Sequence, residues 1–138
     1  EDYIVPIGVA DVKCPGRDVT IVAYAQGLQV ALEAANQLAQ EGIEAEVIDL
    51  RSLRPLDMGP VLESFRKTFK AVVVEEGYGT YGIGAEIAAR LQEEGFDYMD
   101  APVKRVAQFE VPLPYSRELE QSALINKDRV IAAVKEIL

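Results

Sequence analysis

The stretch AVVVEEGYGTYGIGAE, residues 71–86, contains an apolar run, two adjacent carboxylates and a group of four glycines. The run at 71–74 lacks polar alternation, which is typical of a strand buried on both faces of a sheet. Apolar residues then recur at helical spacing from Ile83 onward. A strand, a glycine turn and a helix form the βα unit of a parallel sheet, whose functional loops lie at the carboxyl ends of the strands. We therefore expect any function of this chain within residues 75–84.

The rest of the chain repeats this alternation of strand and helix. Further strands are predicted at 7–13, 19–24, 44–50 and 103–107, and further helices at 28–40, 58–65 and 126–138. The short turn at 15–18 predicts that the first two strands run in opposite directions. The later crossovers through helices are expected to be parallel and right-handed. The sequence thus predicts an α/β fold, a three-layer α/β/α sandwich on a sheet of about five strands, mostly parallel with one antiparallel strand.

Length and charge limit the classes of function. A chain of 138 residues can bury its own core, so we predict a single domain spanning 1–138. It starts at Glu1 without methionine, which suggests a piece excised from a longer chain. A formal net charge of −9 disfavours binding to nucleic acid or anionic membranes and leaves a basic protein partner open. No apolar run approaches the roughly 18 residues of a membrane span, so no membrane association is expected.

The chain has few residues suited to catalysis. Histidine is absent and Cys14 is the only cysteine. The commonest general base and metal ligand is therefore missing. A single thiol allows neither an internal disulfide nor a cysteine zinc site. Cys14 precedes Pro15 in a turn, and we interpret it as an inert thiol. We assign no catalytic residue, no metal site and no cofactor-binding residue, which disfavours a free-standing enzyme.

The glycine loop fits the letters G-x-G-x-x-G at 77–82, a weak match on its own. It follows an inner strand late in the chain, and Glu75 and Glu76 would repel a pyrophosphate. We therefore interpret the glycines as permitting a tight turn and close helix–sheet approach. The two carboxylates point to opposite faces of a continuing strand and cannot share one acid–base site. We expect one of them to pair with Arg51 or Arg54; alternatively, these arginines form a small-anion site beyond the strand ends.

Aromatic and proline residues are concentrated in the last two loops of the predicted sheet. If those loops lie near the glycine loop, their side chains form an aromatic rim. Clustered exposed aromatics beside prolines favour a protein interface over a cofactor site. The predicted interface residues here are Tyr78, Tyr81, Ile83, Phe109, Pro112, Pro114 and Tyr115.

Several blocks of sequence together resemble one family. They are EAEVIDLRSLRPLD (44–57), VVVEEG (72–77), GIGAEIAA (82–89), DAPVKRVA (100–107) and VPLPYSRELE (111–120), and the opening YIVPIGVADV (3–12) is similar to that family's linker and first strand. The resemblance is to the carboxyl-terminal domain of the beta subunit of thiamine-dependent 2-oxo acid dehydrogenases, of the pyruvate and branched-chain types. The wider fold family is the transketolase carboxyl-terminal domain. Because the blocks occur in the right order over nearly the whole chain, the match is specific.

The resemblance implies a non-catalytic assembly domain of a pyruvate dehydrogenase beta subunit. In the parent enzyme, thiamine diphosphate and its magnesium lie between two other domains, so no cofactor is expected in this chain. The implied partners are further copies of the chain in a dimer or higher oligomer, an alpha subunit, and the acyltransferase core. Asp100 either contacts a basic docking domain of that core or only orders the turn before Pro102. The implied location is a bacterial cytoplasm or an organelle matrix.

Two segments depart from the family's pattern. Residues 78–81 replace a stretch that is often polar, basic or histidine-containing, and residues 107–110 lack the usual glycine and carry an added aromatic. Both lie on loops expected at the family's interface. They raise the hypothesis of a surface altered, naturally or by engineering, to favour a different self-association. A small-anion-binding regulatory module using Arg51, Arg54 and the glycine loop is the other alternative function.

Overall fold

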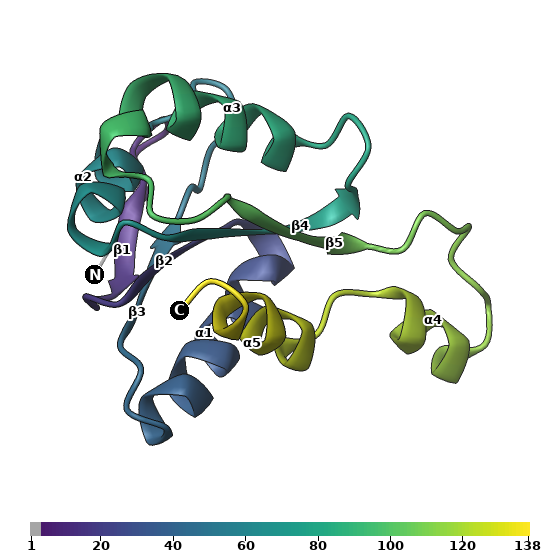
Figure 1. Cartoon of the computed structure of the whole chain (residues 1–138). Helices are drawn as coiled ribbons and strands as arrows, with labels where there is room; N and C mark the ends of the chain where they lie inside the picture. The colour runs from purple at the N-terminus through teal and green to yellow at the C-terminus, as the bar shows by residue number, and fades with distance from the viewer. Residues whose placement is uncertain (1–3) are drawn as a thin grey trace.

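The computed structural model describes residues 4–138, and Figure 1 shows a sheet covered by helices on both faces. The strands, in the order β1-β3-β2-β4-β5, are β1 (Asp11–Cys14), β3 (Ala45–Asp49), β2 (Val19–Ala23), β4 (Ala71–Tyr78) and β5 (Lys104–Gln108). β1 pairs antiparallel with β3, and the other neighbours are parallel. This confirms the predicted sandwich with one antiparallel strand. Tyr3, at the start of the segment resembling the family's linker, lies outside the described residues.

Helices α1 (Ala25–Gln40) and α5 (Lys127–Lys135) pack on one face of the sheet, and α2 (Gly59–Thr68) and α3 (Ile83–Gly95) pack on the other. Alternate residues of β4 pack into the apolar cores on the two faces of the sheet. Val72 and Val74 belong to the apolar core under α1 and α5, whereas Ala71 and Val73 belong to the core under α2 and α3. All four are fully buried, as expected for a strand without polar alternation.

Two local features differ from the sequence prediction. The first strand begins at Asp11 rather than at residue 7, after a turn containing Gly8 at φ +75°. Asp57 is not the N-cap of α2, which is Met58. Instead its two carboxylate oxygens accept hydrogen bonds from Gly59 N and Ala10 N, each at 3.0 Å. Asp57 therefore joins the start of α2 to the segment before β1.

A further helix, α4 (Arg117–Ala123), and a 3-10 turn, η1 (Phe96–Tyr98), were not expected from the sequence. The chain after β5 leaves the sandwich as an irregular arm, carries α4 near its tip and returns to α5 (Figure 1). None of the helices in residues 4–138 has the length and apolar character required to cross a bilayer.

Candidate protein–protein interface

The glycine loop after β4 and the arm after β5 are joined by side-chain hydrogen bonds. Tyr78 Oη donates to the carbonyl of Val111 at 3.1 Å. Thr80 donates twice to Glu110 Oε1, from its backbone N–H at 3.0 Å and from its hydroxyl. These Thr80 bonds, first that of the hydroxyl and then that of the backbone, lower the pKa of Glu110, so the carboxylate is the form that holds the loops together. The structure thus places the two loops side by side.

Two arginines, one on β5 and one on α5, contact the same pair of loops. Arg105, on β5, donates from NH1 to the carbonyl of Gly79 at 2.8 Å. The guanidinium carbon of Arg129, on α5, lies 4.4 Å from the centre of the Phe109 ring, which is cation–π geometry. Phe109 is also tied through its backbone N–H to the carbonyl of Ala123 at 3.0 Å. Several contacts therefore fix the backbone of the two loops.

The side chains carried by these loops remain in solvent. Tyr81 and Tyr115 have relative exposures of 101% and 106%, and Tyr78 and Phe109 are about half exposed. Exposed apolar residues that the sequence did not single out lie on the same arm: Val111, Leu113 and Leu119. Exposed apolar groups held on a fixed backbone are typical of surfaces that bind other proteins. We call the loops at 78–82 and 109–115 the aromatic rim.

Not every predicted interface residue belongs to the aromatic rim. Pro112 is exposed and Pro114 is half-buried on the arm, but Ile83 is half-buried and packs against the core under α2 and α3. Asp100 precedes β5, and its N–H donates to the carbonyl of Phe69, just before β4. Because β4 and β5 are parallel, Asp100 lies at the opposite end of the sheet from the rim. Any contact it makes with a partner is therefore a separate one.

Glu75 is fully buried and faces α3. Its Oε2 accepts a hydrogen bond from Gly84 N, in the first turn of that helix, at 2.9 Å. A Cβ at Gly82 or Gly84 would lie 2.5 Å from one of the Glu75 carboxylate oxygens. The glycines are needed because the helix start closes directly onto a carboxylate, which confirms the interpretation of a close helix–sheet approach. The same carboxylate takes the N–H that a phosphate would need, so the loop does not fit a dinucleotide.

Glu76 points to the other face of the sheet, as expected for the next residue of a strand. Its Oε2 accepts a hydrogen bond from Gln26 N, in the first turn of α1, at 3.3 Å. Tyr24, just before α1, is partly buried beside both carboxylates. Burial first, and then the charges of Glu75 and Glu76, raise the pKa of its phenol. The two adjacent glutamates thus accept hydrogen bonds from the N-termini of helices on opposite faces of the sheet.

The predicted ion pair between these glutamates and Arg51 or Arg54 is wrong. Arg51 instead contacts Asp11 at 2.6 Å and Asp49 at 3.8 Å, both on the β1–β3 side of the sheet. Glu75 and Glu76 each accept one hydrogen bond from a helix N-terminus instead, and the second carboxylate oxygen of Glu75, Oε1, is buried without a hydrogen-bond partner among the described residues. Arg54 is exposed and makes no ion pair with another residue of the part described. With Arg51 committed to two carboxylates, nothing supports the small-anion alternative.

The sequence analysis did not predict helix α4 or the pair of hydrogen bonds from Thr80 to Glu110, which we call the latch. A signal for α4 was present, since Ser116 is a residue type favoured at N-caps and Glu118 and Glu120 follow in the first turn. The latch had no sequence signal, because the two residues are 30 positions apart.

The sequence was compared with known proteins. The family model described as "Transketolase, C-terminal domain" matches residues 8–130. The chain is 46% identical over 137 residues to the mitochondrial pyruvate dehydrogenase E1 component subunit beta of Dictyostelium discoideum, covering 99% of this chain and 38% of that protein. It is 44% identical over 137 residues to the corresponding subunit of Rhizobium meliloti, covering 99% of this chain and 30% of that protein. The chain thus spans only about a third of these relatives.

A solved structure described as a split gene transketolase, inactive beta4 tetramer, has the same fold. It superposes with a TM-score of 0.83 at 37% identity, covering 95% of this chain and 42% of that chain. The relatives give no support to the hypothesis of a surface altered toward a different self-association. The family model covers most of the chain, and the observed sandwich agrees with a solved transketolase. The chain therefore belongs to the transketolase C-terminal domain family.

Proposed function

We propose that this chain is the non-catalytic subunit-assembly domain of a pyruvate dehydrogenase E1 beta subunit. In the whole enzyme it would support the thiamine-dependent oxidative decarboxylation of pyruvate and acyl transfer to lipoamide. The similarity to E1 beta subunits over nearly the full chain supports the identity of the parent protein. The observation that carries the assembly role is the aromatic rim, where Tyr81 and Tyr115 stand fully exposed on hydrogen-bonded loops.

The residues of this chain do not fit the cofactor of such an enzyme. Gly84 N, at the helix start that follows the glycine loop, already donates to the Glu75 carboxylate. Within residues 4–138 no group of three or more cysteine, aspartate or glutamate side chains is arranged to hold a metal ion. Thiamine diphosphate and magnesium would therefore bind to other domains of the parent protein. The contribution of this chain is to hold subunits together.

The proposed partners are other polypeptides of the same complex. The rim residues Tyr78, Tyr81, Phe109, Pro112, Pro114 and Tyr115 would contact a neighbouring subunit, either a second beta subunit or an alpha subunit. The tetrameric state given for the split gene transketolase beta chain supports self-association of this kind of domain. Asp100, at the far end of the sheet, would offer a separate acidic contact to the acyltransferase core. The location implied by these relatives is an organelle matrix or a bacterial cytoplasm.

The test is assembly of the full-length beta subunit with its alpha subunit. Tyr81→Ala combined with Tyr115→Ala removes two exposed rings without touching the core, so the fold should be kept. We expect assembly, followed by size-exclusion chromatography with light scattering, to weaken by at least about tenfold, as for aromatic hot spots. Tyr98→Ala, which removes a partly exposed ring outside the rim, is the control. Unchanged assembly of the double variant, or turnover of pyruvate by this chain alone, would overturn the proposal.

A further inference from the structure

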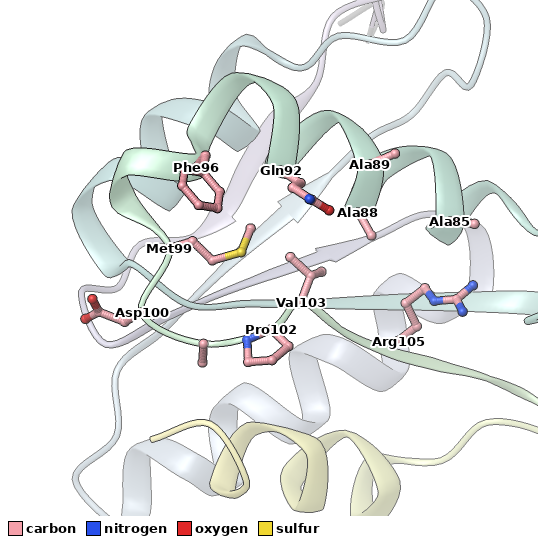
Figure 2. A pocket seen from close by; sticks show the side chains of 11 residues that line it. Ala85, Ala88, Ala89, Gln92, Phe96, Met99, Asp100, Pro102, Val103 and Arg105 are labelled. Carbon is pink, nitrogen blue, oxygen red and sulfur yellow. The ribbon is translucent and has the colours of Figure 1, made fainter.

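Two hollows flank β5, the strand at one edge of the sheet. The larger, of about 690 Å³, is a groove between α3 and the segment before β5, and its helical wall carries the small side chains Ala85, Ala88 and Ala89 (Figure 2). The smaller, of about 330 Å³, lies between β5 and α5, and we call it the β5–α5 pocket. Neither hollow was expected from the sequence.

The β5–α5 pocket is basic, although the chain as a whole has a net charge of −9. β5 contributes Lys104 and Arg105 to its lining, and α5 contributes Arg129 and the carboxylate of Glu136. Three cations and one carboxylate leave two positive charges in excess. A chain of net negative charge repels anions at long range. An anion that binds here is therefore held by contacts inside the pocket and not by the general field of the protein.

The guanidinium of Arg129 has a hydrogen-bond donor to spare. Its Nη1 is buried and has no hydrogen-bond partner among residues 4–138. The guanidinium is held over the Phe109 ring, with its central carbon 4.4 Å from the ring centre, so it is not free to swing into bulk solvent. Buried donors are nearly always paired, and a charged one without an acceptor is costly. An oxygen acceptor in the pocket that Arg129 lines would remove that cost.

The other two cations are also available to a ligand. Lys104 Nζ contacts Glu136 Oε2 at 2.5 Å, but the two side chains are 39% and 61% exposed. Exposed ion pairs contribute little to stability, so an anion can replace Glu136 beside Lys104 at small cost. Arg105 gives one N–H to the carbonyl of Gly79 and keeps further guanidinium donors. We therefore expect direct contacts from Lys104 and Arg129, with Arg105 adding positive charge at the strand edge.

We propose that the β5–α5 pocket binds the phosphate dianion of a small molecule, with the phosphate between Arg129 and Lys104. A phosphate is favoured over a single carboxylate because a dianion matches the two excess positive charges, and because a guanidinium binds two phosphate oxygens at once. The volume of about 330 Å³ is near the lower limit of small-molecule sites, so the phosphate carries at most a short group. The site is separate from Arg51, which lies at the opposite edge of the sheet beside β1 and β3.

Phosphate on Arg129 would also stabilise the arm after β5. The Arg129 guanidinium contacts Phe109 as well as the pocket, so a ligand that fixes the guanidinium fixes the ring too. The backbone N–H of Phe109 donates to the carbonyl of Ala123 at 3.0 Å, which closes the base of the arm. A ligand that binds the closed arm better than the open one shifts the population toward the closed form. Phosphate should therefore slow hydrogen exchange at the Phe109 amide.

The first test is a titration of the chain followed by NMR at constant ionic strength and neutral pH. Inorganic phosphate and glycerol phosphate are the probes, and acetate and chloride are the comparison anions. We expect saturable shifts with both phosphates at the Arg129 side-chain N–H and at the amides of Ala132 and Ala133, together with slower exchange at Phe109. Tighter binding of glycerol phosphate assigns the site to a phosphate monoester, and equal binding assigns it to free phosphate. Shifts that are absent, or equally large with acetate or chloride, would refute the proposal.

The second test uses variants of the lining residues. Arg129→Gln and Lys104→Gln should each weaken phosphate binding by at least about tenfold, since each removes a charge-assisted hydrogen bond. Lys104 is an exposed side chain, so its variant should keep the fold even if Arg129→Gln loosens the arm. Glu136→Gln should instead tighten binding several-fold, because it removes the competing carboxylate. Lys135→Gln, which removes a positive charge from the same helix outside the pocket, is the matched control and should bind phosphate like the unaltered chain.

Unchanged binding in Lys104→Gln, or weaker binding in Glu136→Gln, would overturn the assignment. Binding is measured on this chain alone and needs no partner subunit. Its failure therefore leaves the Tyr81 and Tyr115 test of the proposed function unaffected, and the reverse also holds.

Discussion

Replacing Gly84 with alanine should destabilise this chain, although alanine is the better helix former. Inside a helix the substitution is favourable by up to about 1 kcal/mol. Here the new Cβ would lie 2.5 Å from Glu75 Oε1 and 3.0 Å from its carboxyl carbon. Glu75 is fully buried and bonded to Gly84 N at 2.9 Å, so its carboxylate has no free space to enter. Overpacking of this kind costs about 1–3 kcal/mol.

The expected net effect is a loss of about 2 kcal/mol in the free energy of unfolding, because overpacking exceeds the gain in propensity. In a chain of this size it lowers Tm by roughly 5–8 °C. Urea titration measures the loss in the free energy of unfolding, and the slope m should be unchanged. Gly77→Ala, near the end of β4, is the control, since a Cβ there meets nothing within 4 Å. It should change stability by less than about 0.5 kcal/mol.

A double-mutant cycle identifies Glu75 as the cause. Glu75→Ala alone removes a charge-assisted hydrogen bond and leaves Gly84 N without an acceptor, at a cost of about 2–3 kcal/mol. In that background Gly84→Ala meets no carboxylate and should be neutral or stabilising. The coupling between the two sites should therefore reach about 2 kcal/mol. Additive effects, or a stabilising Gly84→Ala in the natural sequence, would show that the contact between helix and carboxylate is not what selects glycine.

Two further predictions concern other carboxylates. Burial opposes ionisation of Glu46, but hydrogen bonds from Lys67, Gly16 and Ser64 outweigh burial and lower the pKa of this carboxyl group. The ionised Glu46 therefore stabilises the folded chain fully above about pH 4.5, and this stabilisation is lost as the pH falls through the lowered pKa. Lys67→Met should cost about 2 kcal/mol in urea titration at pH 7 and less at pH 3, because it strands a buried charge; equal losses at both pH values would contradict this. Glu110→Gln should loosen the latch at neutral pH in the way that acid does for the unaltered chain, seen as faster exchange of the Thr80 amide; unchanged exchange would exclude the latch.

The order of strands and helices could be predicted because each strand has its own local signal. The run at 71–74 and the β-branched run of β2 are buried on both faces, and such runs have no other stable place in a domain of this size. The single antiparallel strand followed from the short turn after it. Pairing of β1 with β3 rather than with β2 was not predicted, because strand order depends on contacts between distant segments.

The candidate site was predicted less completely, for a physical reason. Exposure of Tyr81 and Tyr115 could be anticipated, since their loop sequences are rich in glycine and proline. The partners of Glu75, Glu76 and Arg51 could not, because each choice among carboxylates, arginines and helix N-termini is decided by distances in the folded chain. The groove between α3 and β5 was missed for a related reason. Small residues such as Ala88 are equally compatible with a buried and an uncovered helical face.

The neighbouring carboxylates at the end of β4 impose a strict spacing on this part of the sequence. Side chains at odd-numbered positions of the strand, Glu75 among them, lie on the face of the sheet covered by α3, and those at even-numbered positions, Glu76 among them, lie on the face covered by α1. Deleting or inserting one residue within 71–74 would turn Glu75 toward the face of α1 and Glu76 toward the face of α3, because a one-residue shift exchanges the two faces of a strand. Length variation between homologous proteins should therefore collect in the arm after β5 and be absent from this strand.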